Sequence, residues 1–265
     1  MENYPESEID LAFLRACLKE AGALALAQHG PLTSVRAGRV AVKADRSPVT
    51  EVDRQVEDWL VRQVTARYPH HRILSEEGGQ VASGETYTWV IDPIDGTRAY
   101  ASGLPVWGVS IGVLRDEEPY VGGLYLPVTG EMYWGTTAQA YYNDQRLTPP
   151  ARIDPDSPLA FLAVPSDFHR KFQVAYPRIR SLGSTAAHLA YVGTGAAVGA
   201  LVYPFSLWDL AGILPMLRAL GIATETLSGA PFQPADLLSG QKASEPFLAA
   251  QPGVIQTLRA GIRRI

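Results

Sequence analysis

The sequence predicts a layered protein of the α+β or α/β class, and two observations carry this prediction. Residues 106–147 contain short apolar segments separated by the turn sequences "RDEEP", "PVTGE" and "NDQ", which is typical of an antiparallel meander. Beyond residue 158, strand-like and helix-like segments alternate, and this combination favours sheets covered by helices. Because the Pro-rich residues 148–158 separate the two patterns, we expect an N-terminal α+β half (1–148) and a C-terminal α/β half (149–265) within one compact unit.

Two helices, a strand or hairpin and two further strands are predicted ahead of the meander. The first helix ends where Gly30 and Pro31 interrupt its apolar periodicity. The second has Thr50 as its N-cap and Asp53 three residues later, as in a capping box. In chain order the predicted elements are a helix at 9–28, a strand or hairpin at 34–45, a helix at 47–69, a short strand and Gly-rich loop at 71–79, and a strand at 86–92.

Alternating elements are predicted after the Pro-rich joint. They are a strand at 159–164, a helix, a strand near Ile179, a helix at 185–193, a strand at 199–203, a helix at 208–220, a short strand, and a helix at 252–265. Such alternation is typical of α/β units.

Composition and charge narrow the possible functions. A net charge of −4 gives no basic footprint, so we expect neither a nucleic-acid partner nor an anionic membrane partner. Cys17 is the only cysteine, which excludes an intramolecular disulfide and predicts a small core residue in a reducing compartment. The apolar stretches are interrupted before membrane-spanning length, and "MENYPESEID" lacks the features of a signal peptide. We therefore expect a cytoplasmic globular protein.

Acidic residues recur directly after apolar strands. Glu76 and Glu77 follow "RIL", Asp92 and Asp95 follow "WVI", and Asp209 lies in "LWDLAG". Open α/β sheets place their sites at strand ends, and Mg²⁺ prefers oxygen ligands from a few carboxylates, water and phosphate. Four of these carboxylates, all except Glu77, would suit two such ions.

The segment "WVIDPIDGT" places two carboxylates beside a predicted anion site. Pro93 stiffens the turn, so the side chains of Asp92 and Asp95 and the carbonyl of Ile94 can point the same way. Gly96 and Thr97 then open a short helix, whose free N–H groups favour phosphate. Metal ions beside a phosphate cradle imply phosphoryl chemistry.

Simpler interpretations of the same segment exist. Asp92 and Asp95 could be only turn and N-cap residues. An EF-hand is excluded, because Ile94 would occupy loop position three and Gly103 position twelve, where oxygen ligands are required. The aspartyl-phosphate phosphatases space their two aspartates by two residues, whereas the spacing here is three.

Five sequence blocks together decide between these interpretations. "SPVTEVD", "SEEGG", "WVIDPIDGT", "SLGSTAA" and "WDLAG" occur in this order, and the chain resembles the inositol monophosphatase superfamily of Mg²⁺-dependent, lithium-sensitive phosphatases over nearly its whole length. The resemblance implies a layered αβαβα sandwich, usually a homodimer. It also implies a phosphomonoester hydrolase that releases phosphate from a small phosphorylated alcohol by two-metal activation of water.

The resemblance also assigns roles to individual residues. Asp53, Thr97 and Glu76 are the expected catalytic residues, with Thr97, hydrogen-bonded to Asp53, orienting or deprotonating the attacking water. The expected ligands of two or three Mg²⁺ ions are Glu76, Asp92, the Ile94 carbonyl, Asp95 and Asp209. The expected substrate-binding residues are Gly96, Thr97, Gly183, Ser184, Thr185 and Asp209, with Glu77 and Lys43 close to the site.

Other polar and aromatic residues have simpler expected roles. Asp53 could serve only as the third residue of a capping box, and Asp209 only as an N-cap. The residues expected at the surface or in structural roles are His70, His71, His169 and His188. The aromatic residues expected to pack the meander or an interface are Tyr133, Trp134, Tyr141 and Tyr142.

Two positions depart from the pattern of typical inositol monophosphatases. A Glu that accepts hydrogen bonds from inositol hydroxyls usually lies seven residues before the second-signature Asp, but here that position is Val202. Arg98, Ala99 and Tyr100 replace the usual "TNF", and "GTRAY" with "PVTGE" is similar to the histidinol-phosphate phosphatase branch. Arg98 could equally form a salt bridge on the short helix.

The sequence therefore does not decide which phosphorylated compound is the substrate. Inositol phosphate or a sugar phosphate, histidinol phosphate, a nucleotide 3′-phosphate and fructose 1,6-bisphosphate are the alternatives. A non-catalytic regulatory protein that kept the fold is the alternative from another class, and it would predict loss of Thr97, Asp53 or a metal ligand. All of them are present.

Overall fold

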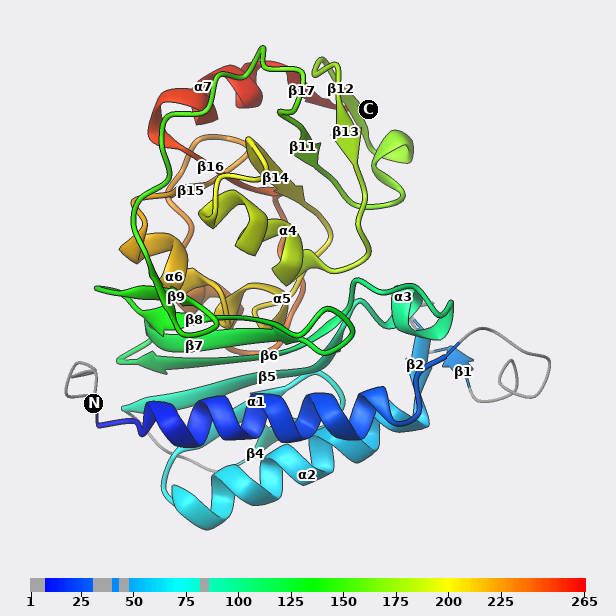
Figure 1. The fold of residues 1–265 in the computed structure, drawn as a ribbon, viewed down its shortest axis with the longest axis vertical. Helices are drawn as coiled ribbons and strands as arrows, with labels where there is room; N and C mark the ends of the chain where they lie inside the picture. The colour runs from blue at the N-terminus through cyan, green and yellow to red at the C-terminus, as the bar shows by residue number, and fades with distance from the viewer. Residues whose placement is uncertain (1–7, 31–39, 43–47, 82–85) are drawn as a thin grey trace.

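The computed structural model describes residues 8–30, 40–42, 48–81 and 86–265 (Figure 1). From bottom to top, Figure 1 shows a helical layer, a large sheet, a second helical layer, a smaller sheet and a final helix. This is the αβαβα order that the resemblance implied, and that prediction is confirmed. Among the described residues, none of the helices combines the length and hydropathy needed to cross a bilayer.

Helices form the outer and central layers. They are α1 (Leu11–Leu26), α2 (Glu51–Arg67), α3 (Thr97–Ala101), α4 (Thr185–Gly193), α5 (Trp208–Ala211), α6 (Leu214–Ala219) and α7 (Pro252–Ala260), with 3-10 turns η2 (Phe168–Arg170) and η3 (Pro234–Leu237). Helices α1 and α2 cover one face of the larger sheet, α4 to α6 lie between the sheets, and α7 covers the smaller sheet (Figure 1).

The larger sheet is antiparallel except between β3 and β5. In spatial order its strands are β10 (Gln145–Leu147), β9 (Ala140–Tyr142), β8 (Glu131–Thr136), β7 (Glu118–Leu126), β6 (Gly108–Arg115), β5 (Tyr87–Asp95), β3 (Arg72–Ser75) and β4 (Gly79–Val81). The strands β6 to β10 are the predicted meander, since each pairs with the next along the chain.

The smaller sheet mixes parallel and antiparallel pairs. In spatial order its strands are β13 (Ile179–Arg180), β11 (Leu162–Ala163), β14 (Gly199–Val202), β16 (Phe247–Ala250) and β15 (Ala223–Thr226). Two ribbons complete the structure, β1 (Val40–Val42) with β2 (Pro48–Thr50), and β12 (Phe172–Val174) with β17 (Ile262–Arg264).

Strand β5 lies at the centre of the core. All nine of its residues are buried. Trp89 and Ile91 face the cluster under α1 and α2, whereas Val90 faces the cluster around α4 to α6. Burial on both faces explains why the strand is a continuous apolar run and does not alternate. Each such side chain contributes roughly 1.5–3 kcal/mol through the removal of apolar surface from water, so the end of β5 is a rigid support.

Several local predictions differ from the structure. The helix expected between residues 164 and 179 is wrong, because the segment forms the turn η2 and then β12, which pairs with β17. The helix expected at 208–220 is divided into α5 and α6, since Pro215 lies in the first turn of α6 and has no N–H to continue a helix from α5. Strand β4 begins at the last residue of a predicted loop, and two strands, β15 and β16, replace one. The helix expected at 252–265 ends at Ala260, because the residues after Gly261 pair with β12 as β17.

Candidate active site

The last residues of β5 carry the two aspartates that the sequence singles out. Asp92 pairs with Ser110 of β6, and Asp95 pairs with Gly108, so three steps on β5 match two steps on β6. Residues three apart on a regular strand face opposite sides of the sheet. The extra residue is a β-bulge, which re-aims side chains, and it allows the carboxylates of Asp92 and Asp95 to meet.

A cluster of three carboxylates forms at this point. The ligand atoms of Asp92, Asp95 and Asp209 all lie within 4.8 Å of one another. Asp209 comes from α5, which packs against β5 and β6. Its Oδ2 accepts the N–H of Ser206 at 2.6 Å, which holds the side chain in place. The fold thus brings together aspartates that are more than a hundred residues apart.

Burial and mutual repulsion disfavour the charged forms of these aspartates. Burial is the main cause that raises the pKa of Asp92 well above its usual value, and the charges of Glu76 and Asp95 raise it further. Burial likewise raises the pKa of Asp209, with Asp95 as the next cause. Burial raises the pKa of Asp95 to about 6, although hydrogen bonds from α4 oppose the shift. Such carboxylates are costly without a cation.

Glu76 lies in the turn after β3, near enough for its charge to act on the cluster. Its N–H donates to the carbonyl of Ile91 on the neighbouring β5 at 3.3 Å. Its negative charge acts on Asp92, Asp95 and Asp209. The parallel pairing of β3 with β5 explains this convergence, because both strands end at the same edge of the sheet.

Asp53 and Thr97 form a hydrogen-bonded pair beside the carboxylates. Thr97 Oγ1 lies 3.2 Å from Asp53 Oδ1 and 3.1 Å from the carbonyl oxygen of Ile94, so one hydroxyl proton has two acceptors. Asp53 is fully buried, and burial raises its pKa to about 6 despite hydrogen bonds from Thr50. The predicted capping box is present too, since the N–H of Thr50 donates to Asp53 Oδ2 at 2.8 Å.

Asp95 also anchors the start of α4. Its carboxylate accepts the N–H groups of Thr185 at 3.1 Å and Ala186 at 2.8 Å, and the hydroxyl of Ser184. Ser184 is itself the N-cap of α4, accepting the N–H of Ala187 at 3.0 Å. The segment "GST" predicted to contact the substrate is thus fixed to the carboxylate cluster.

Gly96 lies between β5 and α3 in a left-handed conformation with φ of 93°. A Cβ atom at this position would lie 2.7 Å from the carbonyl oxygen of Gly183. Only glycine satisfies both conditions without strain. The close contact brings Gly96, Thr97 and the start of α4 to one place.

The remaining predicted residues lie in different surroundings. Glu77 is in the same turn as Glu76, whereas Lys43 lies outside the described residues. Val202 ends β14 and belongs to the buried hydrophobic cluster around α4 to α6. Arg98 is exposed on α3 and near Asp167, whose pKa is lowered because Lys171, assisted by Arg98, outweighs the effect of burial.

The histidines and the meander aromatics have structural contacts. His188 Nε2 accepts the N–H of Leu182 at 2.9 Å, and the side chain is buried. His71 stacks on Tyr68 with ring centroids 4.8 Å apart. Trp134 and Tyr141 stack across β8 and β9 at 4.3 Å. Cys17 is buried in the core, and burial raises its pKa to about 12.

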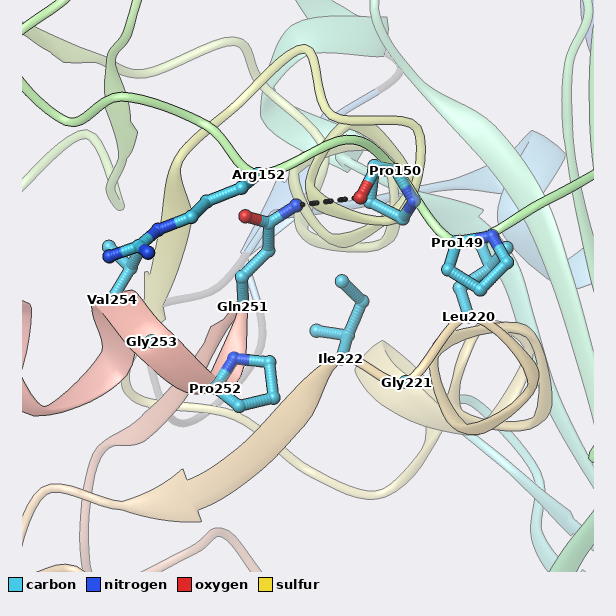
Figure 2. Close-up of a pocket in the computed structure, with 10 residues that line it drawn as sticks. All are labelled: Pro149, Pro150, Arg152, Leu220, Gly221, Ile222, Gln251, Pro252, Gly253 and Val254. Carbon is cyan, nitrogen blue, oxygen red and sulfur yellow. Dashed lines mark hydrogen bonds between the residues drawn. The ribbon is translucent and has the colours of Figure 1, made fainter.

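A cavity of about 440 Å³ lies elsewhere in the molecule. Figure 2 shows its lining, in which Gln251 reaches across to donate a hydrogen bond to the carbonyl of Pro150 at 3.2 Å. The lining comes from the Pro-rich joint, the segment after α6 and the start of α7, and includes none of the predicted site residues. This cavity is therefore not the predicted active site.

One buried carboxylate near the site was not predicted from the sequence. Glu57 lies one turn after Asp53 on α2, and its Oε2 accepts the N–H of Glu77 at 2.8 Å. Burial raises the pKa of Glu57 to about 7, against the effect of its hydrogen bonds. A spacing of four residues to Asp53 was the available indication, because it places both carboxylates on one helix face.

Comparison with known proteins identifies the family of the chain. The model of the "Inositol monophosphatase family" matches residues 7–262. The "Fructose-1,6-bisphosphatase/inositol-1-monophosphatase" of Aquifex aeolicus is 31% identical over 229 residues, covering 81% of this chain and 85% of that protein. The "Inositol-1-monophosphatase ImpA" of Mycolicibacterium smegmatis is 32% identical, covering 83% and 81%.

A solved structure shows the same fold. The inositol monophosphatase TM1415 of Thermotoga maritima superposes with a TM-score of 0.77 at 24% identity, covering 94% of this chain and 95% of that chain. The chain described here belongs to the inositol monophosphatase family. Its reaction class is that of a phosphoric monoester hydrolase, and its acidic cluster could hold a metal ion.

Proposed function

We propose that the protein is a Mg²⁺-dependent phosphatase that hydrolyses a small phosphorylated alcohol. The observation that carries this proposal is the convergence of Asp92, Asp95 and Asp209 within 4.8 Å, next to the Thr97–Asp53 pair. Buried carboxylates this close to one another suit a cation. The Thr97–Asp53 pair suits proton transfer to or from water.

The donor set fits hard divalent cations. The proposed ligands are Glu76, Asp92, the Ile94 carbonyl, Asp95 and Asp209, all of which offer oxygen, as Mg²⁺ requires. Bound divalent cations polarise the phosphoryl oxygens and lower the pKa of water. We expect two or three Mg²⁺ ions and inhibition by Li⁺, as in the family that the sequence resembles.

Within this proposal the protein's own groups position the reactants and move protons. Thr97 Oγ1 accepts a proton from the attacking water as it donates its own proton to Asp53 Oδ1, over the observed 3.2 Å contact. The N–H groups of Gly96 and Thr97 hold phosphate oxygens. Gly183, Ser184 and Thr185 contact the alcohol portion of the substrate. The leaving oxygen takes a proton from a second water, and the proton held by Asp53 neutralises the hydroxide that this produces, so atoms and charges balance.

The identity of the alcohol is the finer part of the proposal. The names of the two relatives above point to inositol 1-phosphate and fructose 1,6-bisphosphate as substrates of those proteins. Val202 is buried among apolar residues, so it offers no acceptor for inositol hydroxyls. This observation favours a test of histidinol phosphate and a nucleotide 3′-phosphate beside inositol 1-phosphate. We further expect a cytoplasmic homodimer.

A phosphate-release panel tests the proposal. Inositol 1-phosphate, histidinol phosphate, fructose 1,6-bisphosphate and adenosine 3′,5′-bisphosphate are compared with and without Mg²⁺. We expect Mg²⁺-dependent turnover of at least one of them, and a loss of at least 100-fold in kcat in Asp92→Asn. Asp58→Asn removes the same charge from an exposed position of α2 and should leave turnover unchanged. Full activity of Asp92→Asn would exclude the metal mechanism.

A further inference from the structure

Glu57 is a buried acid that points at the loop carrying Glu76. It is 4% exposed on α2. Its carboxylate accepts the N–H of Glu77 at 2.8 Å, and further hydrogen bonds from the N–H of Gly78 and the hydroxyl of Ser75. Three donors from one four-residue stretch thus converge on one side chain, and Glu76 lies inside that stretch.

The loop is held from its other side by the sheet. The N–H of Glu76 donates to the carbonyl of Ile91 on β5 at 3.3 Å. The backbone of Glu76 is thus fixed to the strand that carries Asp92, and the next two N–H groups are fixed to α2. A side chain whose backbone is held on both sides loses little further freedom when it binds a ligand.

The loop also fits closely against the carboxylate. A Cβ atom at Gly78 would lie 2.7 Å from Glu57 Oε1, which is closer than van der Waals contact allows. The absence of a side chain at this position lets the backbone approach Glu57. Gly78 therefore matters for the same contact as Glu57, and it provides a second way to disturb it.

We propose that Glu57 is a positioning residue, which fixes the turn of Ser75–Gly78 so that the Glu76 carboxylate points into the cluster of Asp92, Asp95 and Asp209. The inference rests on the proposed function, because it takes Glu76 to be a metal ligand. In this arrangement one face of α2 supplies two buried carboxylates: Asp53 holds Thr97, and Glu57 holds the Glu76 turn.

The role predicts weaker metal binding when the contact is changed. Glu57→Gln keeps the shape and one accepting oxygen, but its amide group presents donors to a backbone that also donates. Groups that orient metal ligands cost about 10–100-fold in metal affinity or activity when they are removed. Gly78→Ala should act in the same direction because its Cβ would push the turn away from Glu57.

Each variant has a matched control. Asp58→Asn neutralises the neighbouring acid of α2 at an exposed position. Gly253→Ala adds a Cβ where no atom lies within 4 Å. The controls should leave metal binding unchanged.

The experiment measures Mn²⁺ binding to the metal-free protein by calorimetry, together with hydrogen exchange at the amides of Glu77 and Gly78. We expect Glu57→Gln and Gly78→Ala to raise the Mn²⁺ dissociation constant at least 10-fold and to speed exchange at both amides. In the phosphatase assay, the Mg²⁺ concentration for half-maximal activity should rise, while KM at saturating Mg²⁺ should not.

The outcomes separate this inference from the proposed function. A Mn²⁺ dissociation constant of Glu57→Gln within 2-fold of that of the wild type overturns the positioning role. If Glu57→Gln does not fold, the same criterion applies to Gly78→Ala against Gly253→Ala. A wild-type protein that binds Mn²⁺ but hydrolyses none of the phosphate esters would contradict the proposed function and leave the positioning result intact.

Discussion

The buried side chain of His188 makes the stability of the fold depend on pH. Its Nε2 accepts the N–H of Leu182 at 2.9 Å, and only the neutral imidazole can accept there. Burial lowers the pKa of His188 to about 4. An unfolded histidine titrates near 6.5. The unfolded chain therefore binds one proton more than the folded chain between these two values.

The contribution of His188 to stability should fall as pH decreases through this window, whereas the raised pKa values of Asp53, Glu57 and Asp95 act in the opposite direction. The contribution of His188 is fully present above the unfolded pKa of about 6.5 and is lost progressively toward pH 4. Between pH 7.5 and 5.5 this loss is about 1 kcal/mol of unfolding free energy. Urea unfolding at the two pH values measures it. His188→Gln keeps an acceptor that does not titrate, so the unfolding free energy of the wild type relative to that of His188→Gln should drop by this amount from pH 7.5 to pH 5.5.

The exposed His169→Gln serves as the control and should keep the wild-type pH dependence. Equal pH dependence of His188→Gln and the wild type would contradict a titrating role for His188.

At the residue scale, the sequence was informative where partners are close along the chain. The capping box of Thr50 and Asp53 follows from a spacing of three residues, and the structure contains it. The contact of Asp53 with Thr97 spans 44 positions and was expected only through the family resemblance. Glu57 was missed because its donors lie about twenty residues away and two of the three are backbone N–H groups, which leave no mark on side-chain patterns.

At the element scale, the junction between α3 and α4 depends on a backbone contact. Gly96 adopts φ of 93° and lies against the carbonyl of Gly183, which itself has φ of 115°. The same junction includes the hydrogen bonds from α4 to Asp95. Two helices from different halves of the sequence thereby meet at the carboxylate cluster.

Gly96→Ala should destabilise the protein strongly. A left-handed non-glycine residue costs roughly 1–2 kcal/mol, and overpacking against a backbone oxygen adds about 1–3 kcal/mol. Gly130 is the matched control, because its φ is 70° but no atom lies within 4 Å of the position that a Cβ would take. Gly130→Ala should therefore show only the backbone cost.

The stability of both variants is measured by the midpoint of urea unfolding, provided that the dependence of the unfolding free energy on urea concentration is unchanged. An equal loss of stability in Gly96→Ala and Gly130→Ala would show that the steric contact with Gly183 adds nothing to the destabilisation.

Elements with local patterns were predicted better than elements defined by distant partners. The helices α1 and α2 and the meander follow from periodicity and turn residues, and the structure confirms them. Strand β12 was missed because its only described partner is β17, about ninety residues later, and its three residues give no clear alternation. The strand ending in Asp95 was expected to stop at Asp92, because Pro93 and Gly96 suggested a turn and a bulge leaves no clear pattern in sequence.

At the scale of the whole molecule, the layers bury a charged cluster between two sheets. Asp92 and Asp95 extend from a strand that is buried on both faces, and Asp209 comes from the central helical layer. The folded chain thus keeps repelling carboxylates close together, which lowers its stability without a cation. A ligand that binds only the folded state stabilises it by mass action.

Mg²⁺ should therefore raise the thermal midpoint of the protein. At a concentration 100 times its dissociation constant, the gain is about 2.7 kcal/mol. For a protein of this size, that corresponds to a rise of roughly 5–10 °C. Calorimetric scans with and without Mg²⁺ measure the rise. Asp92→Asn should lose most of it, and Asp58→Asn should keep it. An equal rise in Asp92→Asn would show that the cation acts outside the cluster.

The bulge between Asp92 and Asp95 makes the length of this segment as important as its chemistry. Each residue of a strand advances the chain by about 3.3 Å, so a deletion at Pro93 or Ile94 would retract Gly96 and Thr97 from Asp53 and from α4. A volume-conserving exchange of the buried Ile94 keeps its carbonyl in place. A mutant library aimed at new substrates should therefore hold the number of residues constant here and place its insertions in exposed turns, such as the one at Gly130.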